Sequence, residues 1–448
     1  MVQQPRKILV LSQGVVGQRM SSLGIRSYHI ARVLAERLPQ AMVTLAVPTE
    51  TESLSQNVPF RVVRYTRSSL KSLAREHDIV ISYTLPVSLL PHTRDTRVVL
   101  DLYGVYLPEW LEIANAELRP SQRGAWVDMQ RRKLNLLLTW ADFVLYANER
   151  QRHLYLGMLS AVGRVTPNAY AQDKRLNQLL GLAPLGVRPG EPQRTRRALK
   201  GVRPGIQEGD KVLIWNGAVT EWFDLETLLR AVHLLSQERD DIKLFFMGTE
   251  LPSHPQPAKL KGIGAVAVKE ALRLCEELSL LDRSVFFNID WVGYDDTANY
   301  LLEADIGVCT YFPSLETDYS FRTRFLDLFW AELPIVCTEG DVLAEEVERR
   351  GLGLTVPPRD VQALAKAIQR LADDEALVQA CKQNLRQARE AYRWEKVLEP
   401  LVEFCAGPAP ERSGRRERRW ALAYRLASYR FGRLWQLITT RSSGPPYL

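Results

Sequence analysis

Residues 306–339 read IGVCTYFPSLETDYSFRTRFLDLFWAELPIVCTE, and this stretch decides the fold. The apolar run at 306–311 predicts a buried strand. A polar loop follows, and a helix then leads through Pro334 into a second apolar run at 335–339. Two buried strands joined by a helix are typical of a parallel β-sheet covered by helices. The polar loop follows the carboxyl end of its strand, where open α/β sheets bind ligands.

The same alternation of apolar runs and helix-period segments fills most of the chain and predicts an α/β protein. Residues 186–210 interrupt it with Pro, Gly and charge, which is linker chemistry, and a second break follows residue 406. We therefore expect two Rossmann-like domains, at 1–190 and 205–400, and a tail at 411–448. Long helices are expected near 24–38 and 123–140. The predicted strands are 7–12, 42–47, 60–65, 78–83, 97–102, 142–147, 212–217, 242–248, 284–288, 306–311 and 335–339.

The composition is that of an ordinary globular protein, with 46% hydrophobic and 25% charged residues among 448. No apolar run approaches the roughly 20 residues that span a bilayer, and the first segment lacks the features of a signal peptide. We expect the protein to stay in the cytoplasm. The five cysteines show no pairing pattern, so we expect buried thiols in a reducing compartment.

Positive charge is concentrated at the end of the chain. Residues 411–448 hold nine arginines against two glutamates, and the rest of the chain is neutral overall, which disfavours nucleic acid as a partner of the fold. Residues 418–438 predict an amphipathic helix with aromatic residues on one side and arginines on the other. Such a helix is typical of an anionic membrane surface. Docking on a partner or on the protein's own surface is the alternative.

Two loops place glycines directly after a predicted strand. Gly14, Gly17 and Gly24 follow the first strand, and a helix N-terminus at Gly24 favours an anion, so Gly24 is a candidate donor-binding residue. The spacing is not G-x-G-x-x-G, which disfavours an NAD-dependent oxidoreductase. His29 lies one turn into the helix and is a candidate for contact with the acceptor. The alternative is a flexible turn and a structural histidine.

The loop VLIWNGAVTEWFD at 212–224 opens the second half in the same way. Gly217 ends the strand, and Asp224 is suited to cap the next helix. Trp222 lies in the loop, where a large aromatic residue is less easily explained as core. Gly217 and Trp222 are therefore candidate ligand-binding residues.

The polar loop at 312–323 and the helix after it carry the remaining candidates. Carboxylates here can accept hydrogen bonds from sugar or ribose hydroxyls, and arginines can clamp a diphosphate. The alternative is a solvated loop with an exposed salt bridge. The candidates are Glu316, Asp318, Ser320, Arg322, Arg324 and Asp327.

Taken together, these segments make the chain resemble the retaining glycosyltransferases of family 4, in particular a bacterial subgroup of polysaccharide and O-antigen synthesis. The most specific matching pieces are WNGAVTEWFDLETLLRA and SFRTRFLDLFWAELPIVCTEGD, and the likeness extends over about residues 7–400. The resemblance implies the GT-B architecture, in which an acceptor-side domain and a donor domain face each other across a cleft. It also implies transfer from a nucleotide-sugar to a glycan or lipid-linked acceptor, with retention of configuration.

The family's two donor-site glutamates are only partly present. Aligned on the proline of ELPIV, the ribose-side glutamate falls on Asp327, which is one methylene shorter. The sugar-side glutamate falls on Tyr319, so Glu316 and Asp318 are the candidates to replace it. This departure keeps a second interpretation open, a non-catalytic scaffold or regulatory subunit.

The family's basic pair after the glycine is absent too, because Ala218 and Trp222 stand about where it would be. Arg322 and Arg324 are the candidates to supply that charge from the opposite loop. No Asp-x-Asp motif occurs and the histidines are dispersed, so we expect metal-independent chemistry without a cofactor. We expect a cytoplasmic enzyme, peripheral at the inner face of the cell membrane.

Overall fold

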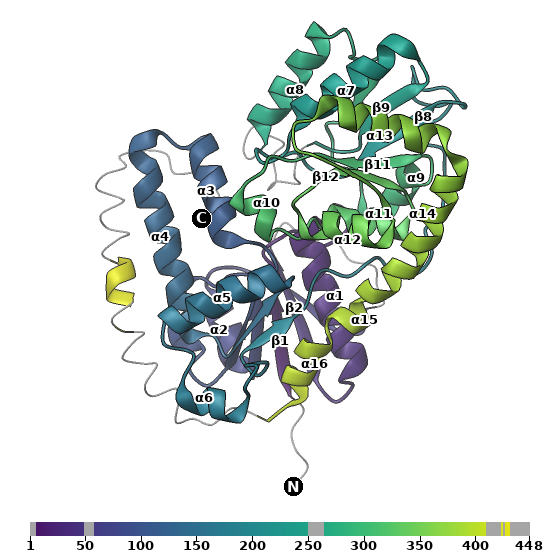
Figure 1. Cartoon of the computed structure of the whole chain (residues 1–448). Helices are drawn as coiled ribbons and strands as arrows, with labels where there is room; N and C mark the ends of the chain where they lie inside the picture. Colours follow the sequence, from purple (N-terminus) through teal and green to yellow (C-terminus); the bar gives the residue numbers. More distant parts are fainter. Residues whose placement is uncertain (1–5, 49–57, 250–263, 409–422, 424–425, 431–448) are drawn as a thin grey trace. The chain divides into compact units, whose positions relative to one another are not determined.

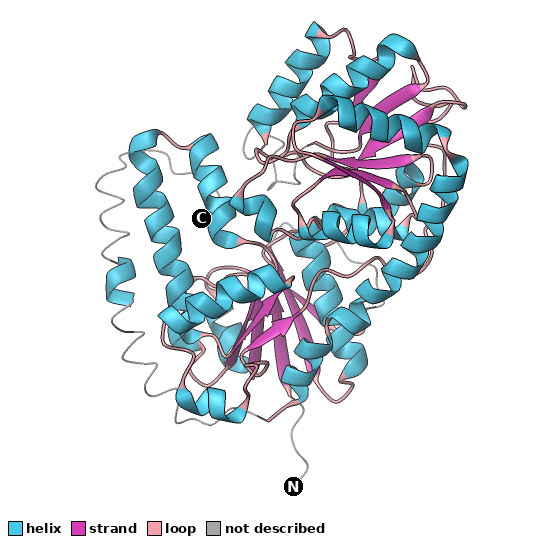
Figure 2. Ribbon diagram, in the orientation of Figure 1, coloured by secondary structure: helices cyan, strands magenta, loops and turns pink. Residues whose placement is uncertain are grey.

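The structure is a computed structural model that describes residues 6–48, 58–249, 264–408, 423 and 426–430. The chain divides into two compact units. Unit 1 comprises Met1–Pro184 and Glu395–Leu448, and unit 2 comprises Leu185–Trp394. Each unit is built on one parallel β-sheet packed against helices (Figures 1 and 2). The predicted α/β fold is therefore confirmed.

Unit 1 has a seven-stranded sheet in the order β3-β2-β1-β4-β5-β6-β7, and every neighbouring pair is parallel. Its strands are β1 (Lys7–Leu11), β2 (Met42–Pro48), β3 (Arg61–Tyr65), β4 (Ile79–Ser82), β5 (Arg97–Asp101), β6 (Phe143–Tyr146) and β7 (Leu180–Leu182). Its helices are α1 (Ser22–Arg37), α2 (Ser69–Glu76), the 3₁₀ helix η1 (Val87–His92), α3 (Tyr106–Glu117), α4 (Pro120–Trp140), α5 (Glu149–Ala161), α6 (Pro167–Gln172) and α16 (Glu399–Ala406).

Unit 2 repeats the plan with a six-stranded parallel sheet in the order β10-β9-β8-β11-β12-β13. Its strands are β8 (Lys211–Trp215), β9 (Ile242–Phe246), β10 (Val285–Phe287), β11 (Ile306–Cys309), β12 (Ile335–Thr338) and β13 (Gly353–Val356). Its helices are α7 (Leu225–Glu238), α8 (Ala265–Glu277), η2 (Tyr294–Asp296), α9 (Thr297–Leu301), α10 (Leu315–Tyr319), α11 (Arg324–Trp330), α12 (Val342–Arg350), α13 (Val361–Asp373), α14 (Glu375–Ala388), η3 (Arg389–Tyr392) and α15 (Trp394–Val397), which leads back into unit 1.

All eleven predicted strands form. Ten of them are largely buried, as continuous apolar runs suggest, whereas β3 at the sheet edge is mostly exposed. Two strands at sheet edges, β7 and β13, were not predicted. Each contains a glycine and lacks a long apolar run. Gly181 in β7 has room for no side chain, since a Cβ there would lie 2.6 Å from the Phe143 ring.

The unit boundaries differ from the predicted domains on both sides of unit 2. Residues 185–210, predicted as a linker, belong to unit 2. They are held there because one oxygen of the Glu303 carboxylate accepts hydrogen bonds from three successive backbone N–H groups, those of residues 198–200, at 3.2, 2.7 and 3.1 Å. Residues 395–400 belong to unit 1. There α16 is held because Arg97 donates to the Phe404 carbonyl at 3.0 Å and Phe404 stacks on Phe143.

All five cysteines are free and buried, as the sequence predicted. Within the described ranges, no helix combines the length and the apolar character needed to cross a membrane. Of the predicted tail helix at 418–438, only residues 423 and 426–430 are described, and these are helical. The rest of that prediction lies outside the described residues.

Candidate functional site

The strand order of unit 2 reverses between β8 and β11, and ligands of open α/β sheets bind at the carboxyl ends of strands at such a point. The loops after these two strands are joined to each other. Phe223 and Tyr311 form an antiparallel bridge, and the Phe312 N–H donates to the Trp222 carbonyl at 3.1 Å. The loops at 216–223 and 310–323 therefore make one continuous edge.

Gly217 begins this edge in a conformation that favours glycine, with φ of +115°. A Cβ at this position would lie 4.0 Å from the guanidinium of Arg324, at the start of α11. Arg324 Nη2 donates to the Ala218 carbonyl at 2.7 Å, and Asn216 Nδ2 donates to the Arg324 carbonyl at 2.8 Å. The strand-end glycine and Arg324, widely separated in sequence, are thus held together.

The Arg324 guanidinium is half-buried between aromatic rings. Its Cζ lies 4.1 Å from the centre of the Phe223 ring and 4.7 Å from that of Trp215. Burial lowers the pKa of Arg324 to about 10, so the side chain stays charged at neutral pH. Its Nη1 has no hydrogen-bond partner among the described residues. A charged donor without a partner at a strand end is suited to bind an anion.

Further buried polar atoms without hydrogen-bond partners among the described residues lie, like Arg324, at the carboxyl ends of the strands of unit 2. Glu221 Oε1 accepts from the Gly264 N–H at 2.6 Å, just before α8, while its Oε2 is unpaired. Most buried polar groups in proteins are hydrogen-bonded, so a group of exceptions needs an explanation. A bound polar ligand would supply one. On the described parts of the loops after β8 and β9, the other buried atoms without a partner are Asn216 Oδ1, Thr220 Oγ1 and Thr249 Oγ1.

Arg322, unlike Arg324, is buried and paired. Its Nη1 and Nη2 donate to the two carboxylate oxygens of Glu316 at 2.7 and 2.6 Å, and Nη2 also lies 3.1 Å from Thr317 Oγ1. Its Nε lies 3.3 Å from Asp341 Oδ2 as an ion pair without hydrogen-bond geometry. Ser320 Oγ donates to Glu316 at 2.5 Å. This cluster of five side chains holds the loop before α11 in place.

Asp341 caps α12, accepting from the Leu343 and Ala344 N–H groups at 2.7 and 3.3 Å. Burial raises the pKa of Asp341 to about 7, and the Arg322 charge opposes that rise. A carboxyl whose pKa is higher in the folded state binds its proton more tightly there. Its contribution to stability is therefore full below about pH 4 and is lost as the pH rises through 7.

We expect Asp341→Asn to remove this pH dependence, because asparagine also caps helices but does not titrate. The free energy of unfolding of the wild type minus that of the variant should fall between pH 5 and pH 8. Urea unfolding at several pH values measures it. Parallel curves for the two proteins would show that Asp341 does not titrate in this range.

Asp327, the predicted ribose contact, lies on α11 next to a residue from the segment before β8. Arg188 Nε donates to Asp327 Oδ1 at 2.7 Å, and the Arg188 guanidinium lies 3.8 Å from the centre of the Tyr294 ring. Trp330 Nε1 donates to the Gly190 carbonyl at 2.8 Å. One oxygen of Asp327 is therefore occupied by Arg188, and only its Oδ2 is open to a ligand.

The structure thus brings only some of the predicted residues together. Gly217 and Arg324 are in contact, and Glu316, Ser320 and Arg322 form a separate buried cluster. Trp222 is half-buried on the joined loops, and Asp318 is exposed on α10.

The chain is similar to several known proteins. Residues 210–374 match the family described as Glycosyl transferases group 1. Over 144 residues the chain is 30% identical to an exopolysaccharide phosphotransferase of Streptomyces coelicolor, a match that covers 30% of this chain and only 15% of that protein. Among solved structures, HepE of Anabaena in complex with UDP and glucose covers 90% of this chain and 100% of its own, with a TM-score of 0.60 and 15% identity. WaaG, a glycosyltransferase involved in lipopolysaccharide biosynthesis, also covers 90% and 100%, with a TM-score of 0.57 and 13% identity.

The fold is that of the GT-B glycosyltransferases. The segment matched by the family, residues 210–374, contains both loops of the site in unit 2.

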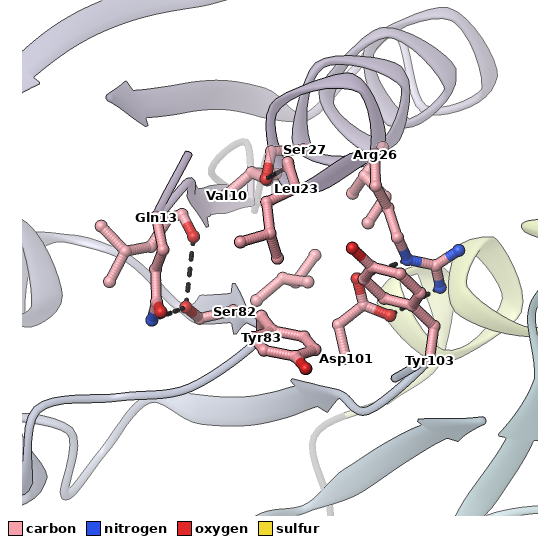
Figure 3. Close-up of a pocket in the computed structure, with 12 residues that line it drawn as sticks. Val10, Gln13, Leu23, Arg26, Ser27, Ser82, Tyr83, Asp101 and Tyr103 are labelled. Carbon is pink, nitrogen blue, oxygen red and sulfur yellow. Dashed lines mark hydrogen bonds and ion pairs between the residues drawn. The ribbon is translucent and has the colours of Figure 1, made fainter. Parts of the chain in front are cut away.

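The first unit of the GT-B fold has its own small pocket at the carboxyl ends of β1, β4 and β5 (Figure 3). Figure 3 shows Arg26 of α1 paired with Asp101, and the two hydrogen bonds are both 2.6 Å. Tyr103 lies over the guanidinium, with 4.7 Å from its ring centre to Cζ. Arg26 also donates to the carbonyl oxygens of Ala183 and Pro184 at 2.7 and 2.9 Å. Arg26 therefore connects α1 to the segment that follows β7.

Two residues of unit 1 predicted to contact ligands are placed in its interior. Gly24 is the third residue of α1, and a Cβ there would lie 2.0 Å from the Val15 carbonyl oxygen, so the absent side chain lets the preceding loop pack closely. His29 is 2% exposed, with its Nδ1 accepting from Arg32 Nε at 3.4 Å. Neither residue is open to solvent.

Several residues of the site were missed by the sequence interpretation. Thr249 follows a glycine at the end of β9, so the rule that selected Gly217 would have found it. Asn216 directly precedes Gly217. Arg188 and Glu221 carry no such local signal, because each is defined by a partner far away in the sequence, Asp327 and Gly264. Asp341 was missed although its position before α12 is that of a helix cap.

Proposed function

We propose that the protein transfers a sugar from a nucleotide-sugar donor to a glycan or lipid-linked acceptor. The observation that carries this proposal is Arg324, a charged side chain beside Gly217 at the strand-order reversal, whose buried Nη1 has no hydrogen-bond partner among the described residues. A diphosphate bound there would pair with the guanidinium. The GT-B fold and the matched family segment also support the proposal of sugar transfer from a nucleotide-sugar.

The donor site proposed here lies on unit 2, with Arg324 as the diphosphate contact. Trp222, Asp318 and Asp327 Oδ2 are the proposed contacts for the rest of the donor, because they are at least partly exposed near the same loops. In this proposal Glu316, Ser320 and Arg322 do not contact the donor, and they contribute by fixing the loop before α11. The acceptor is assigned to unit 1 by the resemblance to family 4.

In the proposed reaction, the bond between the anomeric carbon and the β-phosphate oxygen breaks, and the acceptor oxygen forms the new bond. The acceptor's proton passes to a phosphate oxygen of the leaving nucleoside diphosphate. Negative charge grows on that diphosphate in the transition state, and Arg324 stabilises it without a metal. Retention of configuration, implied by the resemblance, needs no separate enzymic base.

The first donor to test contains uridine diphosphate. HepE, one of the similar structures, was solved with UDP and glucose. Its 15% identity to this chain shows the fold alone, so the base and the sugar are parts of the proposal.

We expect one series of nucleoside diphosphates and their sugars to raise the melting temperature of the full chain. A ligand at 100 times its Kd stabilises the folded state by about 2.7 kcal/mol. For a unit of about 200 residues this is a rise of roughly 5–10 °C. A thermal-shift panel in EDTA measures it, and the rise should persist because the binding uses an arginine rather than a metal.

The same panel distinguishes the alternatives. A rise with NAD alone would favour an oxidoreductase, and no rise with any nucleotide would contradict the proposed donor site. A rise with a nucleotide-sugar, but neither hydrolysis nor transfer over long incubation, would favour the non-catalytic scaffold.

A further inference from the structure

Unit 1 carries a groove one strand further along its sheet than the small pocket of Figure 3. The groove has a volume of about 740 Å³ and lies between α5 and residues 165–177, the segment that contains α6 (Figure 1). We call it the α5 groove. It begins at Tyr146, the last residue of β6, and β6 pairs with β5 through Leu145 and Asp101. Because Asp101 lines the small pocket, both features lie at the edge of the sheet where parallel strands bind ligands.

One wall of the α5 groove is a single face of helix α5. Four residues of this helix line the groove, and their spacings of three, four and four residues place them on one side of a helix. They are Glu149, Arg152, Leu156 and Ser160. At about 1.5 Å per residue, this face is about 16 Å long. The ligand that fits such a groove is a chain of several units rather than a single small ion.

The opposite wall is the turn before β7, which is held both from within and from α5. The two carboxylate oxygens of Asp173 accept the N–H groups of Arg175 and Gln178, each at 2.9 Å. Arg152 donates to the Arg175 carbonyl at 2.8 Å, so the two walls are hydrogen-bonded to each other. Leu176 has a φ of +57°, which a bulky side chain rarely adopts. The chain's own contacts therefore shape the groove, and this lowers the entropy cost of binding.

The charge of the α5 groove is positive. Among the described residues that line it, three are cations, namely Arg152, Lys174 and Arg175. The one acid among them is Glu149. Guanidinium and ammonium groups pair with carboxylates and phosphates. The groove therefore favours a ligand that carries negative charge.

The uncharged part of the lining suits sugar rings. Tyr170 of α6 is 50% exposed, and Lys174 Nζ lies 4.2 Å from the centre of its ring. The face of an aromatic ring is negative and attracts the slightly positive C–H groups on the flat side of a sugar ring. Leu156 and Val165 are half-buried and pack against the core of unit 1, so they form a shallow floor. A protein partner is instead anchored by apolar side chains in deep pockets, so an acidic glycan fits this lining better than a peptide.

We propose that the α5 groove binds an oligosaccharide with carboxylate groups, placing a sugar ring over Tyr170 and the carboxylates on Arg152, Lys174 and Arg175. Its role in the reaction rests on the proposed sugar transfer: the groove holds the part of an acidic acceptor chain that follows the reacting end. The position of the groove, one strand from the small pocket of unit 1, supports this role. Binding itself needs no nucleotide and is tested without one.

The first test compares a charged and a neutral oligosaccharide of the same length. The probes are fluorescently labelled trigalacturonate, with a carboxylate on every ring, and labelled maltotriose. In fluorescence anisotropy with the full chain, trigalacturonate should bind about tenfold more tightly, because hydrogen bonds to charged groups are the stronger ones. Its binding should weaken with salt, since exposed charges are screened within about 10 Å at 0.1 M. Equal affinity for the two probes, or binding of neither, would overturn the proposal.

Single variants place the binding in the groove. Lys174→Gln removes an exposed charge and Tyr170→Ala removes the ring, and each should weaken trigalacturonate binding about three- to fivefold. Lys71→Gln removes an exposed lysine of α2 and should leave binding unchanged. An effect of Lys174→Gln without one of Tyr170→Ala would mean that the groove attracts any anion. Displacement of the probe by an equal concentration of triglutamate would favour an acidic peptide, and either result overturns the glycan.

The outcome for the α5 groove is separable from that for the donor site. If trigalacturonate binds but no nucleotide raises the melting temperature, the groove remains a glycan site and its role in sugar transfer is overturned. If a nucleotide-sugar raises the melting temperature but trigalacturonate does not bind, the proposed transfer stands and the groove inference is overturned.

Discussion

Arg324→Ala should lower the rate of sugar transfer by about 100- to 1,000-fold and leave the chain folded. Removing one hydrogen-bond donor that stabilises a developing negative charge costs roughly this much. The buried Nη1 of Arg324 has no hydrogen-bond partner within the described ranges. Arg324 contacts the Ala218 carbonyl and two aromatic rings, and none of these contacts involves a carboxylate. Steady-state kinetics with the donor found by thermal shift measure the effect.

Two further variants make this result specific. Arg230→Ala removes an exposed arginine of α7 whose partner is Glu226, and it should keep wild-type transfer. Arg324→Lys keeps the charge but loses the fork of donors, and it should recover only part of the rate. Wild-type turnover in Arg324→Ala, with an unchanged donor Kd, would remove Arg324 from the mechanism.

Arg322→Ala should act on stability instead. Arg322 is 6% exposed and joins Glu316 and Asp341, both of which are buried. Removing one partner of a buried ion pair commonly costs about 3–5 kcal/mol, because a charge is left unpaired away from water. Urea unfolding followed by tryptophan fluorescence should show an earlier transition for unit 2 in this variant.

A double variant separates the ion pair from the loss of packing. Arg322→Met with Glu316→Gln removes both charges at similar volume and should recover much of the stability lost in Arg322→Ala. If Arg322→Ala were as stable as the wild type yet failed to transfer sugar, Arg322 would belong to the donor site after all. The two neighbouring arginines are therefore expected to differ in two independent measurements: the rate of sugar transfer for Arg324→Ala and the free energy of unfolding for Arg322→Ala.

Most of the fold was predictable because it depends on local patterns. Buried parallel strands need continuous apolar runs, and these runs placed the eleven strands from Lys7 to Thr338. The edge strands β7 and β13 were not predicted, since each is short, contains a glycine and lacks a long apolar run. The end of unit 2 was predicted at residue 400 and lies at Trp394. No local pattern in residues 395–406 indicates that α16 packs on Arg97 and Phe143 of unit 1.

The sequence by itself determined the class of fold, the loops that follow strand ends, and a short set of charged residues on them. It could not say which arginine keeps a donor without a partner among the described residues, because Arg322 and Arg324 are only two residues apart, at the end of the polar loop and the start of α11. Only the tertiary structure decided this, by placing Glu316 and Asp341 around Arg322 and aromatic rings around Arg324. It also paired Asp327 with Arg188 from a distant segment. The physical reason is that a charge is open to a ligand only where folding leaves it without a partner, and the partners here come from parts of the chain that local patterns do not connect.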